Sequence, residues 1–334
     1  MDKKFRDNLV VSSVPHITTP VDTQKTMLMV LLALAPSFLV SIYVFGARVI
    51  VLTLVCIAAS MFFEWAWNKL FHKDQTVMDF SAALTGTLIA FNVPSNLPIW
   101  IAILGCFVAI VVIKQLFGGI GKNLVNPAIT ARVVLFISFA TQMTTWPLAG
   151  ERGFTDVATG ATPLGILAEG GGTLPSNGQM FLGTIGGSLG EVSAVALLIG
   201  GIFLVYKKII SPIIPCCFIG TVFVIALVYY AIAGVPECAG DTGVFGMAIF
   251  HILAGGVFLG AIFMATDYVT SPLLPFGKIV FGIGCGVITM VIRLWGAYPE
   301  GVSFSILIMN CLCPLVDMWA MKREIKKHQK GGAN

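Results

Sequence analysis

Residues 156–163 read Asp-Val-Ala-Thr-Gly-Ala-Thr-Pro and end with a hydroxyl side chain followed by proline. Threonine before proline is typical of an N-cap and the first residue of a helix, so we expect a short helix after Thr162 that begins at Pro163. A phosphate esterified to the Thr162 hydroxyl would lie at the N-terminus of this helix, where free backbone N–H groups and the helix dipole stabilise negative charge. The residue types therefore favour a site for a phosphate ester.

Two further polar segments interrupt apolar sequence, FGGIGKNLVNPAIT (117–130) and ATDYVTSPLLP (265–275). Each contains a polar residue directly before proline, Asn126-Pro127 in the first and Ser271-Pro272 in the second. We expect both pairs to begin helices. Ordinary capping of a loop-to-helix junction explains such a pair, and so does a pocket in which the positive end of the helix faces an electron-rich ring or an anion.

Four acidic residues lie within or beside apolar runs, namely Glu64, Asp79, Asp267 and Asp317. A charged side chain inside a membrane is costly, so such residues are candidates for an ion pathway. Position alone also allows three of them to reach interfacial water, and allows Asp267 to cap a helix or pair with Lys278. The eight cysteines form no CxxC pattern and the histidines lack metal spacing, so we expect no metal site.

The composition is that of a membrane protein. Of the 334 residues, 57% are hydrophobic and only 11% are charged, whereas soluble domains contain about 25% charged residues. The mean hydropathy is +0.93, which excludes a water-soluble enzyme. The net charge of +4 does not indicate nucleic-acid binding, because the lysines and arginines stand singly at the ends of apolar runs except for a cluster in the C-terminal tail.

Apolar windows bounded by charged residues, glycine and proline predict an all-α, polytopic membrane protein with about ten transmembrane helices. A window of about 20 apolar residues is long enough to cross the hydrocarbon core of a bilayer. The predicted spans are 27–45, 49–68, 77–93, 97–116, 128–146, 190–206, 213–233, 244–265, 277–295 and 302–320.

The positive-inside rule orients these spans. With the N-terminus in the cytoplasm, every lysine and arginine lies on the inner side except Arg48, Arg152 and Arg293, which lie outside, and Arg132, which lies within a span. Both termini are then cytoplasmic, and the longest connection, residues 147–189, lies on the outer face. This loop contains Thr162, and connections of such length are more often functional than structural.

The stretch GCFVAIVVIKQLFGG (105–119) is similar to GCGVITMVIRLWG (284–296), with a basic residue eight positions after each cysteine. In the orientation given above, the first stretch would cross the membrane from the outer to the inner side and the second from the inner to the outer side. This predicts two inverted five-helix repeats, with sites where helices are interrupted. The predicted units are a cytoplasmic segment (1–26), a first repeat (27–146), the outer loop (147–189), a second repeat (190–320) and a basic cytoplasmic tail (321–334).

Four segments in this order, MDFSAALTGTLIAFNVP, GGIGKNLVNPA, DVATGAT and MATDYVTSP, resemble landmarks of a membrane flavoprotein family. Its members include the D subunit of the Rnf complex and the B subunit of the sodium-pumping NADH:quinone oxidoreductase. DVATGAT is similar to the family's flavinylation sequence, and the resemblance covers nearly the whole chain. The compact N-terminal segment is more similar to the Rnf protein.

The resemblance implies two flavins. A flavin transferase would join FMN to Thr162 through a phosphodiester, and it would read the preceding residues Asp156, Thr159, Gly160 and Ala161. A non-covalent riboflavin would lie within the membrane. We expect it at the interrupted segment, near Gly118, Gly119, Gly121, Asn126 and Pro127.

The resemblance also implies a subunit of an ion-translocating ferredoxin:NAD⁺ oxidoreductase of the bacterial inner membrane, passing electrons between flavins and coupled to Na⁺ or H⁺. Its partners would be other membrane and peripheral subunits, including an outer-side subunit with its own covalent FMN, and no nucleic acid. Nicotinamide and iron–sulfur motifs are absent from the sequence, so those steps would belong to partners. Two alternatives stay open: a small-solute, urea-type channel or transporter, and the B subunit of an NADH:quinone oxidoreductase.

Overall fold

The computed structural model describes residues 22–150, 158–170, 172–183, 185–191, 193–240, 242–296, 298 and 300–331. This part of the chain is mostly helical, as expected for an all-α protein. It contains one small sheet, in which β1 (Trp146–Pro147) pairs antiparallel with β2 (Thr159–Gly160).

The N-terminal half contains two long helices followed by several shorter ones. Their bounds are α2 (Thr23–Phe45), α3 (Arg48–Leu70), the 3-10 turn η1 (Val77–Asp79), α4 (Ser81–Phe91), α5 (Ile99–Phe107), the π-helical η2 (Val108–Gln115), α6 (Pro127–Ser138) and α7 (Ala140–Thr144). A helix of 23 residues, such as α2 or α3, is about 34 Å long, enough to cross a hydrocarbon core of about 30 Å.

The C-terminal half begins with two short helices, α8 (Pro163–Glu169) and α9 (Asn177–Leu182). The elements that follow are α10 (Ala194–Tyr206), α11 (Ile213–Ala233), the 3-10 turn η3 (Glu237–Ala239), α12 (Val244–Leu253), α13 (Val257–Leu259), the π-helical η4 (Gly260–Met264), α14 (Pro275–Trp295) and α15 (Val302–Gly331).

Five of the described helices are long and apolar enough to cross a membrane by themselves: α2, α3, α11, α14 and α15. A sixth span results if α12 and the segment Val257–Met264 count as one, although they are bent by 58° at a break. Four shorter apolar helices fall in the remaining predicted windows. The chain is therefore a multi-pass membrane protein, while the count of ten spans and the inverted repeat stay predictions.

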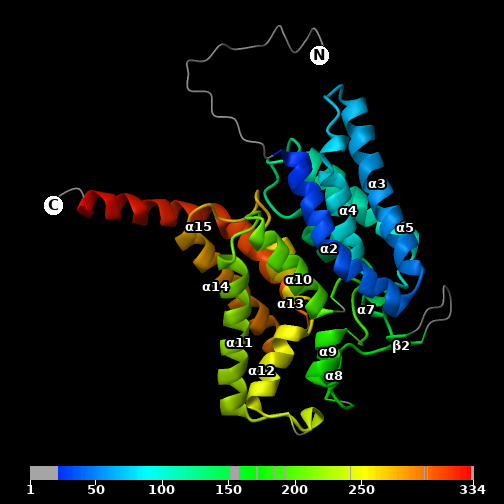
Figure 1. Cartoon of the computed structure of the whole chain (residues 1–334), viewed down its shortest axis with the longest axis vertical. Coiled ribbons are helices and arrows are strands. Elements are labelled where there is room, and N and C mark those ends of the chain that lie inside the picture. Colours follow the sequence, from blue (N-terminus) through cyan, green and yellow to red (C-terminus); the bar gives the residue numbers. More distant parts are fainter. Residues whose placement is uncertain are drawn as a thin grey trace.

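The helices form two groups that lie side by side (Figure 1). In one group α3 packs against α4 and α5, and in the other α11 packs against α12 and α14. The groups are joined by contacts of α2 with α10 and of α6 with α15. Most of α4 is buried inside the first group. Because neighbouring helices surround most of α4, this short helix does not have to reach both membrane surfaces.

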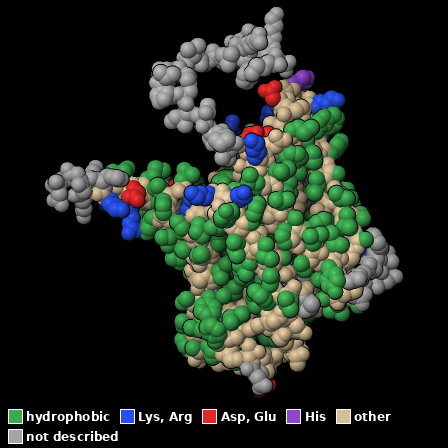
Figure 2. Space-filling model, viewed as in Figure 1, with side chains coloured by type: hydrophobic (Ala, Val, Ile, Leu, Met, Phe, Trp, Pro, Cys, Tyr) green, Lys and Arg blue, Asp and Glu red, His purple; other side chains and the backbone are tan. Residues whose placement is uncertain are grey.

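Hydrophobic side chains cover the flanks of the molecule, whereas basic side chains gather at one end and along the projecting part of α15 (Figure 2). Large exposed apolar residues on several helices contribute to this surface, among them Leu32, Leu39, Ile202, Val224 and Ile232. Apolar exposure on this scale is abnormal for a protein in water and normal for one surrounded by lipid.

Candidate functional site

Thr162 caps the short helix α8, as the sequence predicts. Its Oγ1 accepts a hydrogen bond of 3.1 Å from the backbone N–H of Gly165, and the helix begins at Pro163. The helix ends at Gly170, whose positive φ of 68° suits glycine. The Thr162 side chain is half-buried, so its hydroxyl is fixed in place and still open to chemistry.

The residues before Thr162 are held in an extended conformation by the small sheet. Thr159 and Gly160 pair with β1, and the N–H of Leu148 donates to the carbonyl of Ala158 at 3.0 Å. A Cβ atom at Gly160 would lie 2.7 Å from a methyl carbon of Leu148, so a larger residue here would require the Leu148 side chain to shift. Thr159 and Ala161 are exposed. Asp156 lies outside the described residues.

A small cavity lies beside Thr162, and its walls include the carboxylates of Glu191 and Glu300. Both carboxylates form ion pairs with Arg132 of α6, Glu191 at 3.4 Å and Glu300 in closer contact. The same guanidinium donates to the Asn92 side chain at 2.9 Å. This buried cluster joins the two helix groups, since Arg132 and Asn92 belong to the first and both glutamates to the second.

A second arginine lies at the break between α12 and α13. Gly255 and Gly256 form this break with φ values of 66° and 69°, which exposes backbone carbonyl groups. Arg293 of α14 donates to the carbonyls of His251, Ala254 and Gly255 at 2.6, 2.8 and 3.2 Å. It also donates to the Glu300 carbonyl at 3.0 Å. Arg293 thus satisfies carbonyl groups that the interrupted helix leaves without partners.

Sequence reasoning placed none of Arg132, Glu191, Arg293 and Glu300 in a site. The available signals were an arginine within a predicted span and a Gly-Gly pair inside an apolar run. Neither signal identifies the partner, because Arg132 and Glu300 are 168 positions apart. Only the tertiary structure brings these groups together.

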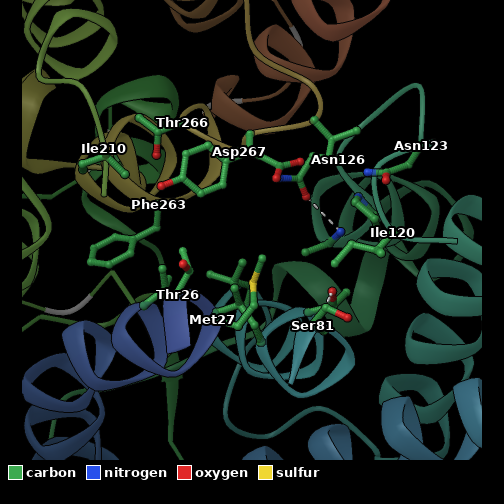
Figure 3. A pocket seen from close by; sticks show the side chains of 18 of the residues that line it. Thr26, Met27, Ser81, Ile120, Asn123, Asn126, Ile210, Phe263, Thr266 and Asp267 are labelled. Atoms are coloured by element: carbon green, nitrogen blue, oxygen red, sulfur yellow. Dashed lines mark hydrogen bonds between the residues drawn. The ribbon is translucent and has the colours of Figure 1, made fainter. Parts of the chain in front are cut away.

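The second region is a cavity of about 120 Å³ between the two helix groups (Figure 3). Thr26, Met27 and Ser81 lie on one side of it, and Phe263 and Asp267 lie on the opposite side. Asn126 and Pro127 of α6 also contribute to the wall. The lining is mostly apolar with a few polar groups, which is typical of binding sites for small organic molecules.

Asn126 is the N-cap of α6, as predicted. Its Oδ1 accepts hydrogen bonds from Ala128 and Ile129, and its Nδ2 donates to the carbonyl of Met264 at 3.1 Å. It therefore joins α6 to the end of η4 in the other helix group.

The three glycines predicted beside this site do not contribute to the cavity wall. Gly118, Gly119 and Gly121 have positive φ values of 112°, 94° and 85°. Their role is to shape the turn between η2 and α6, from which Ile120 and Asn123 reach the cavity.

The predicted helix start at Ser271-Pro272 is wrong. The helix α14 begins at Pro275, and the residues before it form turns. Ser271 donates its backbone N–H to the Asp267 carbonyl at 3.2 Å, and Leu273 donates to Asp317 Oδ1 at 3.2 Å. Asp267 and Asp317 thus hold a turn at the position where the local sequence suits a helix cap.

The four acids have different environments. Glu64 is fully buried and accepts hydrogen bonds from Lys114 and Thr76, both at 2.9 Å, so it does not reach interfacial water. Lys114 lines the central cavity. Asp79 and Asp317 are half-buried, and Asp317 lies apart from this cavity.

Asp267 lines the central cavity and caps a turn instead of pairing with Lys278. Its carboxylate accepts a hydrogen bond from Thr270 Oγ1 at 3.1 Å. Burial raises the pKa of Asp267, and hydrogen bonds from Thr270 and the backbone of Val269 and Tyr268 oppose that shift. Among the described residues, no group of three or more His, Cys, Asp or Glu side chains forms a metal site.

These features define a multi-pass helical membrane protein with polar sites at helix interruptions. The model of the NQR2, RnfD, RnfE family matches residues 10–326, so the chain belongs to this family. It is 44% identical to the D subunit of the Na⁺-translocating ferredoxin:NAD⁺ oxidoreductase complex of Acetobacterium woodii, over 97% of this chain and 98% of the relative.

Two further relatives have related names. The chain is 40% identical to the D subunit of the proton-translocating ferredoxin:NAD⁺ oxidoreductase complex of Clostridium ljungdahlii. It is 38% identical to the D subunit of the ion-translocating oxidoreductase complex of Stutzerimonas stutzeri. Each match covers 92% of this chain and 93% of the relative.

Proposed function

We propose that this chain is the membrane flavoprotein subunit of an ion-translocating ferredoxin:NAD⁺ oxidoreductase. The observation that carries the proposal is the end-to-end similarity to members of such complexes, together with a positioned, accessible hydroxyl at Thr162. The partners are the other membrane and peripheral subunits, including an outer-side subunit with covalent FMN. The complex lies in the bacterial inner membrane with both termini of this chain in the cytoplasm.

The environment of Thr162 fits a phosphodiester to FMN. The hydrogen bond from Gly165 uses a lone pair of Oγ1, so replacing the hydroxyl proton by phosphorus leaves that bond intact. The residues before it are extended, and Thr159 and Ala161 are exposed, which suits recognition by a flavin transferase. Gly160 pairs with Trp146 in the small sheet and lies close to the Leu148 side chain.

The chemistry of the central cavity's lining supports a non-covalent riboflavin there. Apolar side chains from both helix groups suit the faces of an isoalloxazine ring, and Ser81, Asn123 and Asn126 offer hydrogen-bonding groups for its edge or ribityl chain. The Lys114 ammonium donates to Ser81 Oγ at 2.8 Å. The cavity also contains the carboxylate of Asp267, an acid placed to hold a proton.

Each flavin supplies one- or two-electron chemistry when bound. The protein's own residues fix the flavin positions, exclude water and hold charge. The beginning of α2, beside the central cavity, and α8, which Thr162 caps, lie at opposite ends of the molecule (Figure 1). This arrangement supports electron transfer between the outer and inner sides. Ion pathway groups for Na⁺ or H⁺ are Glu64 and Asp267 at or near the cavity, with Asp79 and Asp317 further along the inner side.

The proposal is tested by covalent flavin on a denaturing gel. The full chain is co-expressed with a flavin transferase, and the ultraviolet fluorescence of its band is compared with those of Thr162→Val and Thr159→Val. We expect a fluorescent native band and a dark Thr162→Val band, with Thr159→Val weaker because only recognition is affected. A dark native band, with the transferase active on a control substrate, would contradict the proposal and favour a small-solute transporter.

A further inference from the structure

A second outer pocket adjoins the small cavity beside Thr162, and Leu164 of α8 lines both. Its volume is about 380 Å³, and its walls are formed by α8, the end of α11, α12 and the end of α14. Leu164, Leu167 and Ala168 of α8 face it, opposite Tyr229, Tyr230 and His251. The proposed function leaves this pocket without a role.

Aromatic rings in and beside the wall of this pocket contact one another. The Tyr229 and Tyr230 rings lie 5.1 Å apart and nearly perpendicular, and Tyr230 stacks on His251 with centroids 5.5 Å apart. Trp295 lies edge-on to Tyr229 at 6.0 Å. Such a wall presents both ring faces and ring edges, which favours a planar aromatic ligand.

The hydrogen bond between Tyr230 and His251 makes the tyrosine a donor toward this pocket. Tyr230 Oη and His251 Nε2 are 2.9 Å apart, and His251 Nδ1 is buried without a partner. An unsatisfied N–H is rarer in protein interiors than an unsatisfied acceptor, which favours a neutral ring with its proton on Nε2, donated to Tyr230. The phenolic proton of Tyr230 is then available to an acceptor in the pocket.

Arg293 adds a fixed positive charge to the same wall. Its guanidinium donates hydrogen bonds to backbone carbonyls, and the carboxylates of Glu191 and Glu300 act on it electrostatically. A cation at this edge of the pocket favours a ligand that becomes electron-rich. The small cavity beside Thr162 offers much less room, because its volume is only about 20 Å³.

Thr162 is close enough to tether a ligand in the larger pocket. Ala168 follows Thr162 by six residues, so the length of α8 between them is about 9 Å. An extended ribityl phosphate arm has a comparable length. The arm could therefore follow α8 from Thr162 to the aromatic wall.

We propose that the isoalloxazine ring attached at Thr162 docks against Tyr229, Tyr230 and His251, with Tyr230 donating a hydrogen bond to an acceptor atom of the ring. This inference rests on the proposed covalent flavin. Tyr229 and Tyr230 are binding residues for the ring, and Arg293 supplies the positive charge beside it.

The test measures flavin fluorescence in the folded protein, normalised to the covalent flavin of the same sample on a denaturing gel. Tyrosine and tryptophan in contact with an excited isoalloxazine ring quench it by electron transfer, whereas phenylalanine does not. The full chain is compared with Tyr229→Phe, Tyr230→Phe and Tyr229→Trp. Tyr298→Phe is the matched control, because this tyrosine stacks on Phe304 and does not line the pocket. Thr162→Val supplies the background from non-covalent flavin.

We expect a several-fold rise in native fluorescence for the double variant Tyr229→Phe/Tyr230→Phe, a smaller rise for each single phenylalanine variant because the other tyrosine still quenches, and no rise for Tyr229→Trp or Tyr298→Phe. The substitutions keep a ring at each position, so the fold is preserved. Unchanged fluorescence in the double variant, with gel bands of normal brightness, would overturn the docking site and leave the covalent flavin standing. A dark gel band for the native chain would overturn both.

Discussion

Lys114 and Arg293 occupy matching positions in two similar sequences, GCFVAIVVIK and GCGVITMVIR, and each lines one of two pockets. Lys114 pairs with the buried carboxylate of Glu64 at 2.9 Å. Arg293 donates only to backbone carbonyls, most of them at the break after α12. The compact Lys114 ammonium donates to one carboxylate and to the Ser81 hydroxyl, whereas the guanidinium fork of Arg293 reaches several carbonyls at once.

The difference separates two kinds of polar site. Lys114 and Asp267 line the central cavity, and Lys114 pairs with Glu64 behind its wall; all three are groups that can exchange protons. The outer pocket has a fixed cation and aromatic rings. Similar local sequence therefore places a basic residue beside each pocket, and the neighbours decide what chemistry that residue supports.

The largest effect is expected from Lys114→Met. It leaves the Glu64 carboxylate buried without its cation, and removing one partner of a buried pair destabilises by about 3–5 kcal/mol. Lys114→Met combined with Glu64→Gln should recover most of that loss, since no unpaired charge remains. Thermal unfolding in detergent measures both. Lys122→Met is the control, because Lys122 is exposed. An equal loss of stability in Lys122→Met would show that the effect of Lys114→Met does not come from breaking the buried pair.

Arg293→Lys should have a smaller effect on stability. The charge stays, but a lysine cannot reach all the carbonyls that the fork serves, and each buried group left unsatisfied costs about 1–3 kcal/mol. The melting temperature of the full chain measures the loss, with the exposed Arg323→Lys for comparison. If Arg293→Lys melts like the native protein, the break after α12 does not depend on the guanidinium fork.

Asn126→Ala should cost about 1 kcal/mol through the lost helix cap, together with the bond to the Met264 carbonyl. Asn126→Ser keeps a capping oxygen and loses only the amide donor, so it should be more stable than the alanine variant. We expect both variants to release more non-covalent flavin, while the covalent band on a denaturing gel is unchanged. Loss of the covalent band would show that the two pockets are not independent.

The smallest effect is expected from Asp267→Asn and appears only as a pH dependence. Because the pKa of Asp267 is raised in the folded chain, the folded state holds this proton more tightly than the unfolded state. Stability therefore falls as pH rises above the ordinary carboxyl value of about 3.9 through the raised pKa. Asp267→Asn should flatten that decline in melting temperature. If the melting temperatures of the native chain and Asp267→Asn change with pH in parallel, the raised pKa of Asp267 is contradicted.

Several elements could be predicted from local sequence because their determinants are local. Thr162-Pro163 and Asn126-Pro127 both begin helices with the expected side-chain caps. The apolar windows all contain helices, and five of these helices are long enough to span a membrane. The same reasoning was wrong at Ser271-Pro272, where Asp267 and Asp317 stabilise turns and helix α14 begins at Pro275.

The sequence by itself determined the membrane class of this protein, its family and the position of Thr162 at the start of a helix, because composition, motif order and capping act over short distances. The tertiary structure decided which distant groups meet. Arg132 lies between Glu191 and Glu300, and Tyr230 bonds with His251. These contacts depend on helices from separate parts of the chain packing together. A charge or polar group buried there must find its partner in space, whatever the separation in sequence.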